Sequence, residues 1–183
     1  MTELDRKLAL PIVRIDMGSG SHNMRQPLDE WIRVDGMAHE MIDVVCDFSA
    51  VPLPPHCADI MWSGDTIEHI PTWEMKKTLG EWNRLIKIGG VFCGQTPNLH
   101  ATMMRYAKGE VSLKDATCSL YGWHDHPFQQ HYVTYTTDTL TELLKEYGFD
   151  QVSFAGSPGV EPGDELNAWW LCFICIKIKD SFQ

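Results

Sequence analysis

Short apolar runs alternate along this chain with longer segments that have helical periodicity. Seven of the runs are rich in β-branched and aromatic residues and have the length of strands. They lie at residues 12–16, 31–35, 43–46, 59–62, 91–95, 151–155 and 169–179. Seven strands fit one sheet, so the pattern predicts a single sheet in a single α/β domain.

Two segments have the pattern of amphipathic helices. Apolar side chains recur three or four positions apart at residues 73–87, and leucines form one stripe at residues 138–147. Thr72 is expected to cap the first helix, and Gly89 with Gly90 is expected to end it. Both helices lead into strands, which is typical of a mostly parallel sheet that binds ligands beyond the carboxyl ends of its strands.

Two other segments have neither pattern. Residues 98–130 are polar, aromatic and rich in histidine, and residues 156–167 hold three glycines and two prolines. We expect both to be loops over the ligand crevice, with 98–130 an insertion or lid on the substrate side.

The composition is that of one globular domain. The chain has 183 residues, of which 44% are hydrophobic and 22% charged, enough for one packed core. No apolar run approaches the roughly 20 residues that span a bilayer, and the first residues do not resemble a secretory signal. We therefore expect a cytoplasmic protein without a membrane partner.

The charge balance argues against nucleic acid as a partner. Acidic residues number 25 against 15 Lys and Arg, which gives a net charge of −10. Binding to nucleic acid usually needs an excess of basic residues that neutralise phosphates. The oligomeric state is left open, although seven tryptophans permit a homodimer with an aromatic interface.

The six cysteines are irregularly spaced and mostly lie in apolar runs, which indicates reduced thiols. Cys172 and Cys175 form a CxxC pattern inside the last predicted strand. Residues three apart on a strand face opposite sides, so we expect neither a disulfide nor a shared metal there.

The candidate chemistry begins at the turn after the first predicted strand. Asp16 is followed by Gly18 and Gly20, and a second acid, Asp35, closes the next predicted strand. Glycines in such a turn let the backbone approach a ligand, and the second acid can accept hydrogen bonds from ribose hydroxyls. The pattern predicts a crevice for an adenosine-containing cofactor.

The local chemistry favours S-adenosylmethionine (SAM) over a dinucleotide. A dinucleotide needs its pyrophosphate at a helix N-terminus, but no third glycine follows Gly20, and Pro27 comes before a helix could gain length. Asp16 suits a cation and opposes a phosphate, and SAM carries a sulfonium and an ammonium. An NAD(P)-dependent oxidoreductase of Rossmann type remains an alternative.

At these positions the chain resembles the class I SAM-dependent methyltransferases, in particular the small type 11 or predicted-methyltransferase group. The resemblance extends over most of the chain and rests on six motifs in the expected order. They are the acid-x-Gly-x-Gly turn at 16–20, Asp35, Asp47, the Asp-rich strand with Glu-His at 59–70, the run at 84–92 and the element at 143–149.

The resemblance implies a Rossmann-like methyltransferase fold: one domain over residues 1–183 with a doubly wound seven-stranded sheet, mostly parallel, whose last strand is antiparallel. It also implies SAM as cofactor and S-adenosylhomocysteine (SAH) as product. The cofactor site that it implies consists of Asp16, Gly18, Gly20, Asp35, Gly36, Asp47, Phe48, Gly64 and Asp65.

The chain departs from the family pattern in three places. His22 replaces a small residue of the glycine turn, Ile88 replaces the usual proline, and the segment between the first two strands is short. The short segment implies a truncated first helix. This leaves open a second alternative, a partner subunit that binds SAM without catalysing methyl transfer.

His131 and His69 are the candidate catalytic residues. Related methyltransferases carry a histidine near the acceptor pocket before the last helix, which makes His131 the leading candidate for acceptor contact. The sulfonium is a good leaving group, so the protein mainly aligns the acceptor, and a base is needed only for a hydroxyl or a protonated amine. The sequence thus predicts methyl transfer to a small-molecule or sugar-like acceptor.

A metal site is one explanation for the other histidines. His124 and His126, two residues apart, can chelate zinc or iron together with His131 if the segment is extended. A solvated aromatic substrate loop explains the same pattern, and no metal is predicted.

Overall fold

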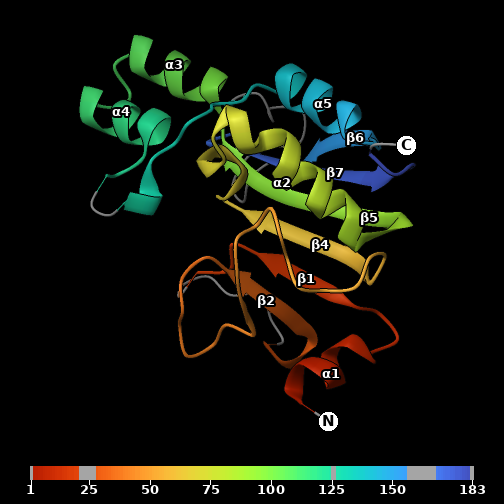
Figure 1. The fold of residues 1–183 in the computed structure, drawn as a ribbon. Helices are drawn as coiled ribbons and strands as arrows, with labels where there is room; N and C mark the ends of the chain where they lie inside the picture. The colour runs from red at the N-terminus through yellow and green to blue at the C-terminus, as the bar shows by residue number, and fades with distance from the viewer. Residues whose placement is uncertain (1, 21–27, 125–126, 156–167, 182–183) are drawn as a thin grey trace.

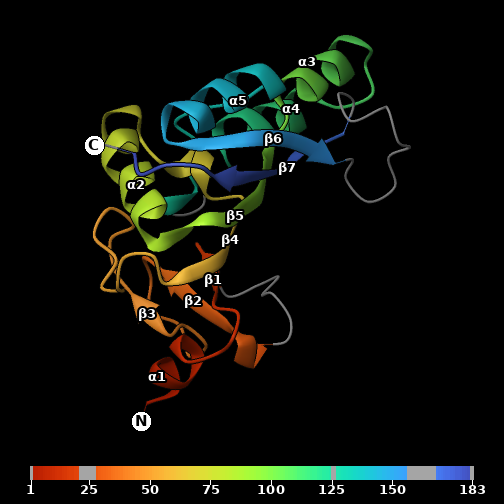
Figure 2. The ribbon, with the colours of Figure 1, turned by 90° about the vertical axis from the view of Figure 1, so that its right-hand side faces the viewer.

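The computed structural model describes residues 2–20, 28–124, 127–155 and 168–181. Within these ranges seven strands form one sheet in the order β3-β2-β1-β4-β5-β7-β6. The strands are β1 (Arg14–Met17), β2 (Trp31–Asp35), β3 (Val44–Val45), β4 (Ala58–Gly64), β5 (Ile86–Pro97), β6 (Phe149–Ala155) and β7 (Trp170–Lys177). Figure 2 shows the sheet running from β3 at one edge to β6 at the other.

The strand directions confirm the predicted fold class. Strands β1 to β5 pair in parallel, and β7 pairs antiparallel with both β5 and β6. Met17, the last residue of β1, lies beside Val34 of β2 and Ser63 of β4. The chain segments that leave these three strands therefore start from one edge of the sheet.

Five helices accompany the sheet in the described ranges. They are α1 (Glu3–Leu8), α2 (Thr72–Leu85), α3 (Leu99–Ala107), α4 (Leu113–Tyr121) and α5 (Thr137–Glu146), with short 3₁₀ turns η1 (Leu28–Glu30), η2 (Ile67–His69) and η3 (Pro127–Gln129). Figure 1 shows α2 and α5 over the β4–β7 half of the sheet and α1 beside β2. None of the helices described is both long enough and apolar enough to cross a membrane.

Helix α2 differs from its prediction at both ends. Pro71 is the N-cap and makes no side-chain cap, so Thr72 is the first helical residue instead of the cap. The helix stops at Leu85, and Gly89 and Gly90 lie inside strand β5. Buried Lys177 explains the early stop, because its Nζ donates to the last-turn carbonyl of Asn83 at 2.8 Å.

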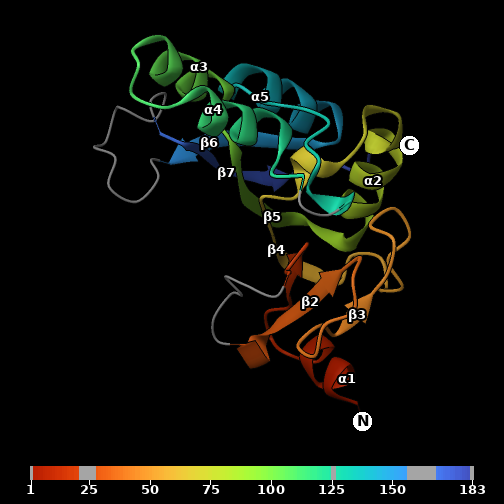
Figure 3. The same cartoon turned by 90° about the vertical axis from the view of Figure 1, so that its left-hand side faces the viewer.

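Segment 98–130 was expected to be a loop, and that prediction is wrong for most of it. It contains α3 and α4, which pack against each other next to the carboxyl end of β5 (Figure 3). Asn98 caps α3, and Ser112 forms a capping box with Asp115 at the start of α4. The other segment, 156–167, lies outside the described residues.

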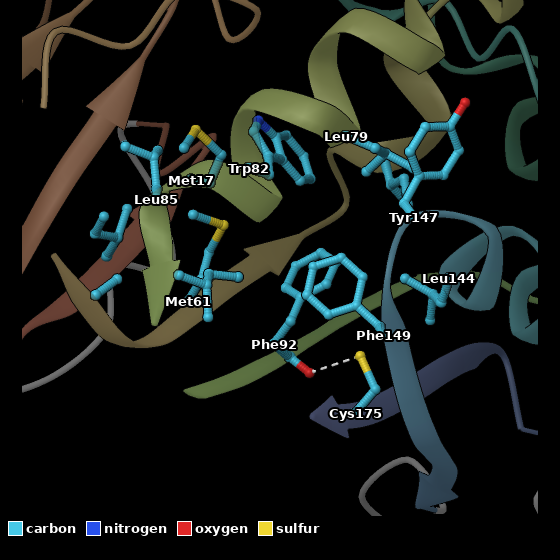
Figure 4. Packing of buried hydrophobic residues seen from close by; sticks show 14 of the residues in the cluster. Met17, Met61, Leu79, Trp82, Leu85, Phe92, Leu144, Tyr147, Phe149 and Cys175 are labelled. Atoms are coloured by element: carbon cyan, nitrogen blue, oxygen red, sulfur yellow. Dashed lines mark hydrogen bonds between the residues drawn. The ribbon is translucent and has the colours of Figure 1, made fainter. Parts of the chain in front are cut away.

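The core is built around Phe92 of β5, which is fully buried. Its ring makes edge contacts with Trp82 at 5.8 Å and with Phe173 at 5.2 Å between centroids, and a tilted contact with Phe149 at 5.2 Å. Figure 4 shows this packing between α2 and the sheet. The aromatic rings thus join α2 to β5, β6 and β7.

All six cysteines are free thiols, as the sequence predicted. Cys175 is buried, and its Sγ donates to the carbonyl of Phe92 at 3.3 Å (Figure 4), whereas Cys172 is only partly buried. Burial raises the pKa of the Cys175 thiol, which keeps it protonated and unreactive.

Replacing Phe92 by alanine should reduce the free energy of unfolding by about 3–5 kcal/mol, because it removes three ring contacts and leaves a cavity. Denaturant unfolding followed by circular dichroism measures this loss. Ile88→Ala, at a side chain 55% exposed on the same strand, is the control and should change stability by less than about 0.5 kcal/mol. Equal losses for the two variants would contradict the description of the core.

Candidate active site

A cavity of about 1150 Å³ opens at the carboxyl ends of β1, β2, β4 and β5. Its walls include all nine residues predicted to bind the cofactor: Asp16, Gly18, Gly20, Asp35, Gly36, Asp47, Phe48, Gly64 and Asp65. It also includes His69, Phe128, Gln130 and Tyr132. The structure therefore brings the predicted cofactor residues to one place, while their contacts to a cofactor stay predictions.

The glycine turn after β1 is fixed by close backbone contacts. Gly18 has a φ of +72°, and its N–H donates to the carbonyl of Val34 at 2.9 Å. A Cβ at Gly18 would lie 2.2 Å from Oγ1 of Thr66, a hydroxyl that donates to the carbonyl of Gly64 at 3.0 Å. Only glycine satisfies both the positive φ and this approach.

Two acids hold the turn from either side. Gly20 N–H donates to Oδ2 of Asp35 at 2.8 Å, and Met37 N–H donates to Oδ1 at the same distance. Asp16 is buried at the end of β1 and accepts from the Ser19 hydroxyl at 3.1 Å. Since each carboxylate oxygen can accept a second hydrogen bond, Asp35 retains capacity for ribose hydroxyls.

Asp47 and Phe48 form the part of the wall after β3. Oδ1 of Asp47 accepts from the N–H and the hydroxyl of Ser49, each at 2.8 Å, and these bonds lower the pKa of the carboxyl. Asp47 is thus an ionised group that shapes its own turn. The ring of Phe48 lies edge-on to Trp82 at 6.3 Å and lines the cavity on its other side.

Asp65 closes the β4 end of the cavity. It adopts a left-handed conformation, with a φ of +49°. Its N–H donates to the carbonyl of Gln95 at 2.9 Å, and its Oδ2 accepts from Nε2 of the same glutamine at 2.6 Å. These bonds connect the ends of β4 and β5.

The structure brings the two candidate catalytic histidines together. The rings of His69 and His131 are 4.7 Å apart and nearly perpendicular. Nδ1 of His69 contacts the carbonyl of Gln130, and Nδ1 of His131 contacts that of Ser119, both at 3.0 Å. Burial lowers the pKa of His131, so its ring is neutral near pH 7. His69 lines the cavity, whereas His131 is not among the residues that line it.

Glu68 is a functional candidate that the sequence analysis did not select. It is 1% exposed; Oε2 accepts from the Thr96 hydroxyl at 3.0 Å, and Oε1 has no hydrogen-bond partner among the described residues. Burial, and next the charge of Asp65, raise its pKa to about 8. The Glu-His pair after β4 was the available signal, but the sequence does not reveal that Glu68 is buried.

The other histidines that the sequence analysis named lie apart from His69 and His131 or outside the described residues. His22 and His126 are outside the described residues, and Nε2 of His124 contacts the carbonyl of Tyr121. Chelation by His124, His126 and His131, which the sequence analysis weighed but did not predict, is therefore not tested. Instead, His131 lies with Glu68 and His69 in a group whose ligand atoms are all within 4.8 Å of one another.

The fold and the cavity define a Rossmann-like domain with a nucleotide-type crevice. The sequence model of a family described as "Methyltransferase domain" matches residues 12–94, which include every predicted cofactor residue. No curated protein matches the chain. The match to the family model covers less than half of the chain, and it supports the predicted enzyme class, a SAM-dependent methyltransferase, with SAM as its cofactor.

Solved structures share the fold at low sequence identity. A SAM-dependent methyltransferase from Thermotoga maritima, described as a possible histamine N-methyltransferase, has a TM-score of 0.63 and 17% identity over 96% of this chain and 87% of its own. The Burkholderia thailandensis 1,6-didemethyltoxoflavin-N1-methyltransferase has a TM-score of 0.56 and 15% identity over 91% and 71%. This chain spans about half of the CurJ carbon methyltransferase (TM-score 0.58, 13% identity, 91% and 48%).

Gly18→Ala should destabilise the fold more than Gly109→Ala, by about 1–3 kcal/mol. Both positions have a φ of +72°, but of the two only Gly18 has a neighbouring atom, in Thr66, that an added Cβ would overlap. The difference between the two variants removes the cost of the backbone conformation, which they share. Denaturant unfolding measures both free energies. If the two variants lose the same stability, the contact with Thr66 does not constrain the turn.

Proposed function

We propose that this chain binds SAM in the cavity at the carboxyl ends of its strands and transfers the methyl group to a small-molecule acceptor that carries a hydroxyl group. The observation that carries the proposal is the lining of one cavity by the glycine turn, four acids and the histidine-bearing turn η2. Small-molecule sites commonly occupy about 300–1,000 Å³. A cavity of about 1150 Å³ has room for a cofactor together with a small acceptor.

The cofactor end is assigned from charge and geometry. Asp16 lies under the glycine turn and suits the ammonium of the methionine part, and Asp35 suits the ribose hydroxyls. Asp47 and Phe48 then face the adenine, with the carboxylate as an acceptor and the ring as an apolar surface. In this arrangement the sulfonium points toward Asp65 and η2.

The acceptor end is assigned to His69 and the neighbouring segment 128–132. Phe128 and Tyr132 supply aromatic surface, and Gln130 supplies polar groups beside His69. Catalysis of methyl transfer is mainly alignment of the acceptor with the methyl group and the sulfur. A sugar-like acceptor remains one form of this substrate class, and helices α3 and α4 are the proposed substrate-side arm. A cytoplasmic location stays a prediction.

Cofactor binding is tested by calorimetry with SAH and by thermal unfolding with SAM, SAH or NAD⁺. SAM and SAH should raise the melting temperature, because they bind the folded state alone, and NAD⁺ should not. Asp35→Asn should weaken SAH binding about 10- to 100-fold by loss of charge-assisted hydrogen bonds. Asp138→Asn, at an exposed position of α5, is the matched control and should bind SAH normally. Stabilisation by NAD⁺ without SAH would favour the oxidoreductase alternative.

Methyl transfer itself is tested with SAM that carries a labelled methyl group and pools of small hydroxylated, amino and sugar compounds. Label should pass to at least one hydroxylated pool, and Asp35→Asn should reduce the rate at low SAM concentration. Binding of SAH without transfer to any pool would favour the non-catalytic subunit.

A further inference from the structure

Three potential metal ligands from distant parts of the chain meet beside the cavity. Glu68 and His69 belong to η2 after β4, and His131 precedes α5. One ligand atom from each of them lies within 4.8 Å of the other two. We call these three residues the Glu68 cluster.

The segment around His131 is fastened to η2 by backbone bonds. Tyr132 N–H donates to the carbonyl of Glu68 at 2.8 Å, and Val133 N–H approaches the same oxygen at 3.3 Å. Nδ1 of His69 adds a contact to the carbonyl of Gln130 at 3.0 Å. These hydrogen bonds therefore hold the two segments that carry the Glu68 cluster next to each other.

Both imidazoles make the backbone hydrogen bond that ligating histidines commonly make. A carbonyl oxygen only accepts, so Nδ1 of His69 and Nδ1 of His131 each carry a proton toward a backbone oxygen. In the neutral ring this leaves the lone pair on Nε2. Ligating histidines in metalloproteins are fixed in this way, with the second ring nitrogen donating to a carbonyl or carboxylate.

Glu68 supplies a buried carboxylate with an unused oxygen. Thr96 satisfies Oε2, whereas Oε1 is buried and has no partner among the described residues. The hydroxyl of Tyr135, on the same segment as His131, is a second buried group without a hydrogen-bond partner within the described part of the chain. Burial of a charged carboxylate costs several kcal/mol unless a cation or hydrogen bonds compensate.

We propose that Glu68, His69 and His131 bind a divalent transition-metal ion that coordinates the hydroxyl group of the methyl acceptor. Two imidazoles and one carboxylate form a donor set for Zn²⁺, Fe²⁺ and similar ions, and three protein ligands leave coordination positions open. His69 faces the cavity, so an open position can point to the acceptor. The catalytic half of this proposal rests on the proposed methyl transfer.

The ion gives the acceptor its reactivity. Coordination lowers the pKa of a bound hydroxyl, which then releases its proton to solvent. The acceptor oxygen attacks the methyl carbon of SAM, the bond between that carbon and sulfur breaks, and the electron pair stays on sulfur. The products are the methyl ether and SAH, and no oxidant or reductant is consumed.

The first experiment measures metal binding without reference to catalysis. The full chain, stripped with a chelator, is titrated with Zn²⁺, Mn²⁺ and Co²⁺ by calorimetry, and the visible absorption of Co²⁺ is recorded. We expect uptake of a single ion by the stripped chain and a Co²⁺ spectrum typical of nitrogen and oxygen ligands. Absence of uptake for all three ions would overturn the proposal.

Variants assign the bound ion to the Glu68 cluster. Glu68→Gln and His131→Ala each remove a direct ligand, so affinity should fall by more than the roughly 10- to 100-fold that loss of an outer-shell partner costs. His100→Ala and His124→Ala, at exposed histidines outside the cluster, should bind the ion as the unchanged chain does. SAH binding by Glu68→Gln and His131→Ala checks that both are folded. Loss of the ion in His124→Ala but not in Glu68→Gln would contradict the assignment.

The two proposals fail separately. If the stripped chain takes up the ion but does not bind SAH, the proposed function is wrong and the metal site stands. If SAH binds and methyl transfer proceeds at full rate in the presence of the chelator, coordination of the acceptor is wrong. Restoration of a lost rate by Zn²⁺, Mn²⁺ or Co²⁺ would support it.

Discussion

The whole crevice depends on the close passage of the turn after β1 against the turn after β4. Gly18 crosses Thr66 at a distance that leaves no room for a side chain, and the Thr66 hydroxyl bonds back to the carbonyl of Gly64. Because the two turns are locked together, Asp35 on one side and Asp65 on the other are placed across the same space. A wider separation would leave two shallow surfaces in place of one cavity.

The aromatic core packs against the cavity wall and supports the position of the two turns. Phe92 and Trp82 join the main covering helix to the centre of the sheet, and Phe48 extends the same stack of rings to the cavity wall. The same group of aromatic side chains thus belongs to the core and, through Phe48, to the wall of the candidate cofactor site. Burial of apolar surface, which is the dominant stabilising contribution to folding, is used here to position residues at the edge where the ligand would bind.

Local patterns in the sequence were enough for the sheet and for the residues around the glycine turn. Strand composition and the order of glycines and acids depend on near neighbours, and all nine candidate cofactor residues share one cavity. The boundary between α2 and β5 was missed because buried Lys177, far along the chain, bonds the end of the helix. Helix α4 was missed although Ser112 and Asp115 gave a capping signal. The burial of Glu68 and its contact with His131 depend on long-range packing, which no local pattern encodes.

The bond from the His131 ring to the carbonyl of Ser119 has a further consequence. Ser119 belongs to α4, which is packed with α3 beside the end of β5 and contributes little to the main core. Any tilt of this pair of helices moves the oxygen that orients the imidazole. The position of α3 and α4 and the orientation of the His131 imidazole are therefore coupled. Binding or displacement of these two helices would change the direction of the imidazole lone pair without direct contact with the histidine.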